Sequence, residues 1–123
     1  MKALITGASS GIGRDMAKYL SGLGCDLIIC GRNKEELERL QSSLKTCVKV
    51  VVIDLSSEKR VKDLYVITKN ENIDILINNA GFGLYGDYNS VDILTELSMI
   101  DVNIKAVHIL TRMFLKDMVK KDK

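Results

Sequence analysis

Three glycines near the amino terminus have the spacing of a loop that binds phosphate groups. They occur in Thr6-Gly7-Ala8-Ser9-Ser10-Gly11-Ile12-Gly13, directly between the apolar run Ala3–Ile5 and a segment with helical periodicity. Gly7 suits a tight turn from strand to helix, Gly11 lets backbone N–H groups approach a diphosphate, and Gly13 allows the helix to pack closely on the strand. The helix N-terminus then offers unpaired N–H groups and a partial positive charge. A glycine turn without a ligand is the alternative, and the position directly after a strand argues against it.

The apolar pattern shows the elements that must position this loop. Four runs rich in Val, Ile and Leu show little alternation, which is typical of strands buried on both faces of a parallel sheet. They are Ala3–Ile5, Leu27–Cys30, Val48–Ile53 and Ile73–Ile77. The segments between them carry apolar residues at helical spacing. These are Ile12, Met16, Leu20 and Leu23, then Leu37, Leu40 and Leu44, then Val61, Leu64 and Tyr65 or Thr68. Strand and helix in strict succession predict a parallel α/β sheet in a single domain over residues 1–123.

The last segment is helical and unusually apolar. One stripe comprises Ile100, Ile104, Val107, Leu110, Phe114 and Met118, and a second beside it comprises Val102, Ala106, Ile109 and Met113. A helix that is apolar over so wide an arc needs cover on two sides. Among the helix ends, Gly24 is a candidate C-cap of the first helix, and Ser56 or Ser57 is a candidate N-cap of the third.

Composition excludes several classes of protein. The chain of 123 residues is 46% hydrophobic and 28% charged with a formal charge of +2, so no global field recruits nucleic acid or an anionic membrane. No stretch approaches the roughly 18 apolar residues of a membrane helix. Cys25, Cys30 and Cys47 form no C-x-x-C pair, which indicates buried thiols in a reducing cytosol. We therefore expect a cytoplasmic protein that binds neither nucleic acid nor membrane.

Four motifs occur in sequence along the chain. They are the loop Thr6–Gly13, Asp54-Leu55 after the third strand, Asn78-Asn79-Ala80-Gly81 after the fourth, and Asp101-Val102-Asn103 followed by Thr111. In this order they resemble the motifs in the cofactor-binding half of short-chain dehydrogenase/reductases. The loop spacing is G-x-x-x-G-x-G, which differs from the general dinucleotide fingerprint G-x-G-x-x-G. The resemblance covers nearly the whole chain. It implies a Rossmann-like parallel sheet, shortened to about four strands in the order 3-2-1-4, with flanking helices.

The resemblance also implies a set of site residues. The residues that would hold a nicotinamide dinucleotide are Gly7, Ser9, Ser10, Gly11, Ile12, Gly13, Arg32, Asn33, Asp54, Leu55, Asn79, Ala80 and Gly81. Within this set, Asp54 corresponds to the residue that bonds the adenine amino group. Asn78 corresponds to a structural residue that ties its loop to the strand. Asn103 corresponds to an asparagine that supports the catalytic proton relay, and a buried helix asparagine satisfied by backbone is the equal alternative.

The end of the second strand indicates which dinucleotide is preferred. An acidic residue there usually binds the ribose 2′-OH of NAD, whereas an arginine accommodates the 2′-phosphate of NADP. Gly31 occupies the place where the resemblance puts the acid, and Arg32 follows it. A guanidinium suits a phosphate dianion, and Ser9 and Asn33 are placed to add hydrogen bonds. The prediction is NADP(H) in preference to NAD(H), with an ordinary exposed arginine at the start of a helix as the alternative for Arg32.

The hydride chemistry of the resembling family needs a Ser, and a Tyr with a Lys four residues later, after a fifth strand. The one spacing match is Tyr65 with Lys69, which falls in the third helix and in its apolar stripe, so a packing tyrosine is favoured. Tyr85 and Tyr88 have no lysine at that spacing, and His108 stands alone. The chain is therefore predicted to be the cofactor-binding portion of an oxidoreductase, not catalytic by itself. A stand-alone dinucleotide-binding module and a non-enzymatic assembly subunit are the alternatives.

Assembly follows from the same topology. Without a fifth strand, Asp74–Asn78 is an apolar edge with unpaired backbone groups, which natural sheets usually avoid. The last helix has a second apolar stripe without cover, and in the resembling family the equivalent helix pairs between subunits. We expect a homo-oligomer through the helix Ile100–Met118, the fourth strand edge, or both.

Overall fold

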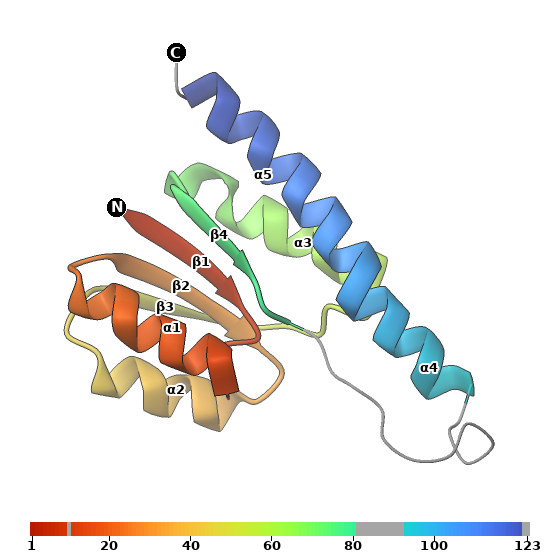
Figure 1. The fold of residues 1–123 in the computed structure, drawn as a ribbon, viewed down its shortest axis with the longest axis horizontal. Coiled ribbons are helices and arrows are strands. Elements are labelled where there is room, and N and C mark those ends of the chain that lie inside the picture. The colour runs from red at the N-terminus through yellow and green to blue at the C-terminus, as the bar shows by residue number, and fades with distance from the viewer. Residues whose placement is uncertain (10, 81–92, 122–123) are drawn as a thin grey trace.

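The computed structural model describes residues 1–9, 11–80 and 93–121. These residues form a four-stranded sheet in which every neighbouring pair is parallel. The strands are β1 (Lys2–Thr6), β2 (Asp26–Gly31), β3 (Val48–Val52) and β4 (Ile75–Asn78). Their order across the sheet is β3-β2-β1-β4, which confirms the predicted order (Figure 1). The carboxyl ends of all four strands therefore lie along one edge.

Helices cover both faces of the sheet. α1 (Gly11–Gly22) and α2 (Lys34–Ser43) lie on one face, and α3 (Glu58–Thr68) and α5 (Val107–Lys121) lie on the other (Figure 1). Alternate side chains of β1 divide between the two cores, with Leu4 in the α3–α5 core and Ala3 and Ile5 in the α1–α2 core. A sheet covered on both faces explains why its strands are continuous apolar runs rather than alternating ones.

The face of α1 that meets the sheet differs from the predicted stripe. Gly13, Ala17 and Ser21 are its buried residues, whereas Ile12 is 70% exposed and Leu23 is 65% exposed. Small side chains let the helix axis come close to the sheet, so Ile12, Met16 and Leu23 are turned outward, whereas Leu20 of the predicted stripe packs partly against the core. Gly24 has a φ of 91°, which confirms it as the residue that ends the helix in a left-handed conformation.

The carboxyl-terminal helix changes its buried face part-way along. α4 (Ile93–Ile100), η3 (Asp101–Ala106) and α5 form one continuous rod in Figure 1, and η3 is a π-helical stretch. The buried residues are Val102 and Ala106, from the second predicted stripe, followed by Leu110 and Phe114, from the first. Ile104, predicted to share a stripe with Leu110, is 60% exposed. Because a π turn contains more residues than an α turn, it shifts the angular register that the sequence pattern assumes.

The predicted helix cap is present, and two of the three cysteines are buried. Ser57 caps α3 by accepting a hydrogen bond from the Arg60 N–H, as one of the two predicted candidates. Cys25 and Cys30 are buried as expected, but Cys47 is exposed. Cys47 lies in the turn that leads into β3, at the edge of the sheet, so it does not pack in the core. None of the helices in the described ranges has the length and apolarity needed to cross a membrane.

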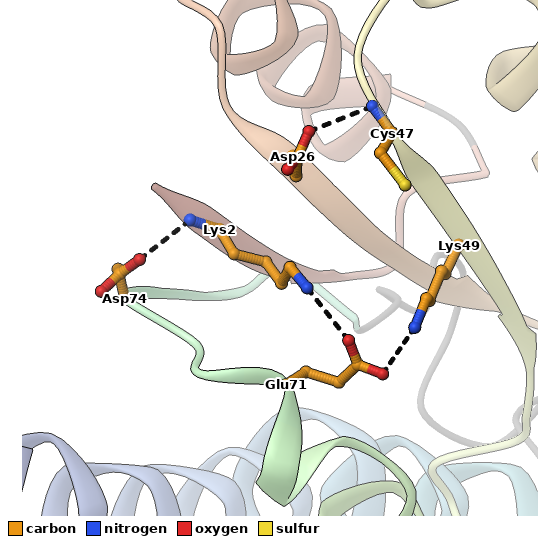
Figure 2. Close-up of polar contacts among 6 residues, drawn as sticks. All are labelled: Lys2, Asp26, Cys47, Lys49, Glu71 and Asp74. Atoms are coloured by element: carbon orange, nitrogen blue, oxygen red, sulfur yellow. Dashed lines mark hydrogen bonds and ion pairs between the residues drawn. The ribbon is translucent and has the colours of Figure 1, made fainter.

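At the amino-terminal ends of the strands, oppositely charged groups bond to one another (Figure 2). The Glu71 carboxylate, in the short helix η1 (Lys69–Glu71), accepts hydrogen bonds from Lys2 Nζ at 3.0 Å and Lys49 Nζ at 2.6 Å. The Lys2 backbone N–H donates to Asp74 Oδ2 at 2.9 Å. The hydrogen bonds from Lys49 and Lys2 lower the pKa of Glu71, and the bond to Glu71 raises the pKa of Lys49. Glu71 therefore ties the chain before β4 to both β1 and β3.

Candidate dinucleotide-binding site

A cavity of about 400 Å³ opens at the carboxyl ends of the strands. Segments that are far apart in the sequence line it: the loop after β1, the end of β2, the segment after β3 and the segment after β4. The lining residues are Gly7, Ser9, Ile12, Gly31, Arg32, Asn33, Ile53, Asp54, Leu55, Asn79, Ala80 and Val102. The carboxyl edge of an open parallel sheet is where ligands bind in folds of this kind. Nine of the predicted site residues are thus brought together in one cavity.

Two of the loop glycines are required by close contacts with the segment after β4. Gly7 has a φ of 67°, and a Cβ added to it would lie 2.7 Å from Ala80 Cα. A Cβ on Gly13 would lie 2.5 Å from Asn79 Nδ2 and would also clash with the Gly7 carbonyl oxygen. Gly11 has a φ of 60° with open space around its Cα, so the start of α1 is accessible to a ligand. The glycines therefore hold the loop against β4 and leave the helix N-terminus open.

Thr6 is a site residue that the sequence reasoning did not single out. Its Oγ1 accepts hydrogen bonds from the Asn79 N–H at 3.0 Å and the Ala80 N–H at 2.9 Å. A further hydrogen bond joins the same two segments, since Asn79 Nδ2 donates to the Gly7 carbonyl oxygen at 3.1 Å. Thr6 is 1% exposed, whereas Asn79 and Ala80 are half-buried, so these bonds lie at the border between the core and the cavity. The sequence feature that could have indicated this role is the position of Thr6, at the end of an apolar strand and directly before the first loop glycine.

Asn78 has a different contact from the expected one. Its Nδ2 donates to Thr111 Oγ1 at 3.1 Å, so it links β4 to α5 rather than the loop to the strand. The tie between loop and strand is made by Thr6 and Asn79 instead. In a parallel strand successive side chains point to opposite faces, which places Asn78 toward the helix that covers its own face.

The polar end of the cavity lies after β2 and β3. Arg32 is exposed at the end of β2, and Asp54 is exposed after β3. Asp54 Oδ1 accepts a hydrogen bond from the Ser56 N–H at 3.0 Å, and this bond, with the positive charge of Arg32 as a smaller cause, lowers the pKa of Asp54. Asp54 is therefore an ionised acceptor at neutral pH. Asn33 Oδ1 caps α2 by accepting from the Glu36 N–H at 3.1 Å, which leaves its NH₂ group for a ligand.

The buried thiol below the loop has no part in the chemistry of the cavity. Cys30 is the residue before Gly31 and has no exposed surface. Burial raises the pKa of its thiol to about 12, so it stays protonated. Cys30 fills space under the loop, as the sequence predicted.

The comparisons with known proteins agree with this geometry. A family model described as short chain dehydrogenase matches residues 1–123. The chain belongs to the short chain dehydrogenase family. The 3-oxoacyl-[acyl-carrier-protein] reductase of Rickettsia prowazekii is 39% identical over 121 residues, which are 97% of this chain and 48% of that protein. The chain spans about half the length of the curated relatives it matches.

Solved structures of short-chain dehydrogenases share the fold. A short-chain dehydrogenase from Sphingobium yanoikuyae in complex with NADPH superposes with a TM-score of 0.89 at 29% identity, covering 98% of this chain and 49% of that one. A metagenomic short-chain oxidoreductase in complex with NADP superposes with a TM-score of 0.90 at 28% identity, covering 100% and 58%. The Rossmann-like architecture read from the strand order is thereby confirmed.

The other residues considered as possible site residues lie either outside the lining of the cavity or outside the described residues. Asn103 is exposed in η3, beside the cavity residue Val102 but not in the lining itself. Tyr65 packs its ring against Phe114, with ring centroids 5.2 Å apart, and its hydroxyl donates to Asp117 Oδ2 at 2.6 Å. The predicted packing role of Tyr65 is thus confirmed. Ser10 and Gly81, and the glycine-rich segment 81–86 with Tyr85 and Tyr88, lie outside the described residues.

Proposed function

We propose that this chain is the cofactor-binding portion of an NADP(H)-dependent oxidoreductase that interconverts an alcohol and a carbonyl compound. The observation that carries the proposal is the end of β2, where Gly31 and Arg32 line the cavity in place of an acidic residue. Arginine presents a planar fork of donors to a phosphate dianion, whereas a carboxylate there repels it. Two neighbours at 28–29% identity bind NADPH and NADP, which supports the assignment.

Each part of the cavity suits one part of the dinucleotide. The open N-terminus of α1 and the loop around Gly7 and Gly11 offer N–H groups to the diphosphate. The ionised Asp54 carboxylate accepts from the adenine amino group, and Arg32 binds the 2′-phosphate. When bound, the nicotinamide supplies hydride transfer, and the protein supplies binding and orientation.

Arg32→Asp tests the cofactor assignment. The chain should bind NADPH more tightly than NADH, and the substitution should weaken NADPH binding by about tenfold to hundredfold, because it removes a charge-assisted contact and adds repulsion. Titration calorimetry with both dinucleotides measures this. Arg39→Asp is the matched control, since Arg39 makes the same charge change on the exposed surface of α2, where it pairs with Glu36. Equal affinities that Arg32→Asp leaves unchanged would contradict the proposal.

We also propose that the chain of residues 1–123 binds the cofactor without turning over substrate. The Ser and the Tyr-x-x-x-Lys that the family uses have no counterparts at matching positions within residues 1–123. A positioned general acid contributes typically about 10²–10⁴-fold to such reactions. Reduction of a ketone panel with NADPH should stay at background, and Tyr65→Phe should not alter any residual rate.

Self-association is the third part of the proposal. Leu97, Ile104 and Leu115 on the rod formed by α4, η3 and α5 are 50%, 60% and 55% exposed. Light scattering on dilute protein should give a mass above that of one chain, and Ile104→Glu should reduce it. Ile104 is a suitable probe because its side chain is 60% exposed, so the substitution does not disturb the core. A compact monomer at micromolar concentration would contradict self-association.

A further inference from the structure

A second cavity lies where the two helices on the α1–α2 face of the sheet end. Its volume is about 510 Å³, and its lining residues are Lys18, Ser21, Gly22, Ser43, Leu44 and Lys45. Both helices begin beside the dinucleotide cavity and run back toward the amino-terminal ends of the strands (Figure 1). Their lengths, about 18 Å for the 12 residues of α1 and about 15 Å for the 10 residues of α2, separate the two cavities.

The lining of this cavity carries two positive charges and no carboxylate. Among the described residues, neither the Lys18 nor the Lys45 ammonium group has a hydrogen-bond or ion-pair partner. Other lysines of the chain pair with a carboxylate, and these include Lys2, Lys34, Lys49, Lys62 and Lys105. A helix C-terminus carries a partial charge of roughly −0.5, so the two helix ends offset about one of the two lysine charges. The charge that remains suits a singly charged anion better than a phosphate dianion.

A buried hydroxyl adds a directional donor to this charge. Ser21 is 7% exposed, and its Oγ lies 2.7 Å from Thr46 Oγ1. One hydroxyl of this pair donates to the other, so the second keeps its own O–H. The part of the chain that the structure describes holds no acceptor for that second O–H. The Ser43 hydroxyl, by contrast, is already used, because it donates to the Leu40 carbonyl oxygen at 2.7 Å. The Ser21–Thr46 pair therefore offers one hydrogen bond to a ligand oxygen.

We propose that this cavity binds a carboxylate group attached to a short apolar chain. The two carboxylate oxygens accept hydrogen bonds from Lys18, Lys45 and the Ser21–Thr46 pair, and the apolar chain packs against Leu44, the large apolar side chain in the lining. The carboxylate belongs either to a free organic acid or to an acidic side chain of another protein. The proposal is independent of the assignment of NADP(H), because the two cavities share no lining residue.

Titration of the isotope-labelled chain with butyrate, followed by NMR at constant ionic strength, tests this site. The amide signals of Lys45 and Thr46 should shift and saturate at millimolar butyrate. Lys18→Gln and Lys45→Gln should each weaken butyrate binding by about three- to fivefold, since each removes one partly exposed charge. Ser21→Ala should weaken it by about threefold, because the hydroxyl pair is lost. Lys59→Gln, on the exposed surface of α3, is the matched control and should have no effect.

A capped peptide with a single glutamate identifies the source of the carboxylate. Tighter binding of the peptide than of butyrate assigns the site to an acidic side chain of a protein partner, and weaker binding assigns it to a free acid, so both outcomes support the proposal. If sulfate shifts the same signals as strongly as butyrate, or if the lysine substitutions at the cavity act no more strongly than Lys59→Gln, the response is a general charge effect and the proposal is overturned. AMP binding should be unchanged in every variant, so the failure of this site is distinguishable from the failure of the proposed function.

Discussion

The two ends of the same four strands are built in opposite ways. At the amino-terminal edge, Glu71 bonds to Lys2 and Lys49, so charged groups satisfy one another within the protein (Figure 2). At the carboxyl edge, Gly7 and Ser9 of the loop after β1 and Arg32 at the end of β2 line a cavity. The first edge joins elements together, and the second leaves donors for a ligand.

Strand direction explains the difference. In a parallel sheet with helical crossovers, each strand leads into the N-terminus of the next helix, so the positive helix ends collect at the carboxyl edge. The amino edge receives helix C-termini and return segments such as η1. The paired charges there lie at the opposite ends of the strands from the cavity, so changing them should have little effect on nucleotide binding. The comparison therefore predicts that substitutions at the carboxyl edge change stability and nucleotide binding together, whereas those at the amino edge change stability without changing nucleotide binding.

The largest effect is expected from Gly13→Ala. The new Cβ would meet Asn79 Nδ2 at 2.5 Å and the Gly7 carbonyl oxygen, so α1 must move away from the sheet. We expect a loss of about 3 kcal/mol in the free energy of unfolding and loss of nucleotide binding. Urea denaturation and calorimetry measure the two effects. Gly22→Ala, at the other end of α1 with open space around its Cα, is the matched control and should be neutral or slightly stabilising.

Thr6→Val should have the next largest effect. The change keeps the shape of the side chain but leaves the Asn79 and Ala80 N–H groups without their acceptor. We expect a loss of about 2 kcal/mol in unfolding free energy and weaker AMP binding, because the segment after β4 is no longer held. Thr46→Val is the counterpart at the amino edge, where Thr46 Oγ1 lies 2.7 Å from Ser21 Oγ. Weaker AMP binding in that variant as well would break the contrast between the edges.

The smallest effect is expected from Glu71→Gln, and its pH dependence sharpens the comparison. The folded pKa of Glu71 lies below its ordinary value of 4.5, so its contribution to stability is present above that pH and is lost as the pH falls through the folded value. The folded pKa of Lys49 lies above 10.5, so its contribution is lost as the pH rises through that higher value. The melting temperatures of wild type and variant should therefore differ slightly near neutral pH and converge in acid. Nucleotide affinity should be the same for both proteins, and a change in it would contradict the separation of the edges.

Local sequence patterns were sufficient for the framework of the molecule. The four apolar runs, the helical periodicities and the spacing of Gly7, Gly11 and Gly13 predicted a parallel α/β sheet with a phosphate-binding loop after its first strand, because each pattern depends on neighbouring residues. The strand order came from the resemblance to short-chain dehydrogenase/reductases. Arg32 followed from its position at the end of the second strand, whereas Asp54 came from the resemblance to the family.

Contacts between distant segments decided the rest. Which side of α1 is buried depends on how closely the helix approaches the sheet, and the shift from Val102 to Leu110 depends on a π turn that no local periodicity reveals. The hydrogen bond from Asn79 to Thr6 joins residues 73 positions apart, and the close approach of Ser9 to Gly31 brings the loop after β1 to the end of β2. Sequence alone determined which residues reach the carboxyl edge, and the tertiary structure determined which of them touch, because side-chain contacts depend on packing distances that the chain order does not contain.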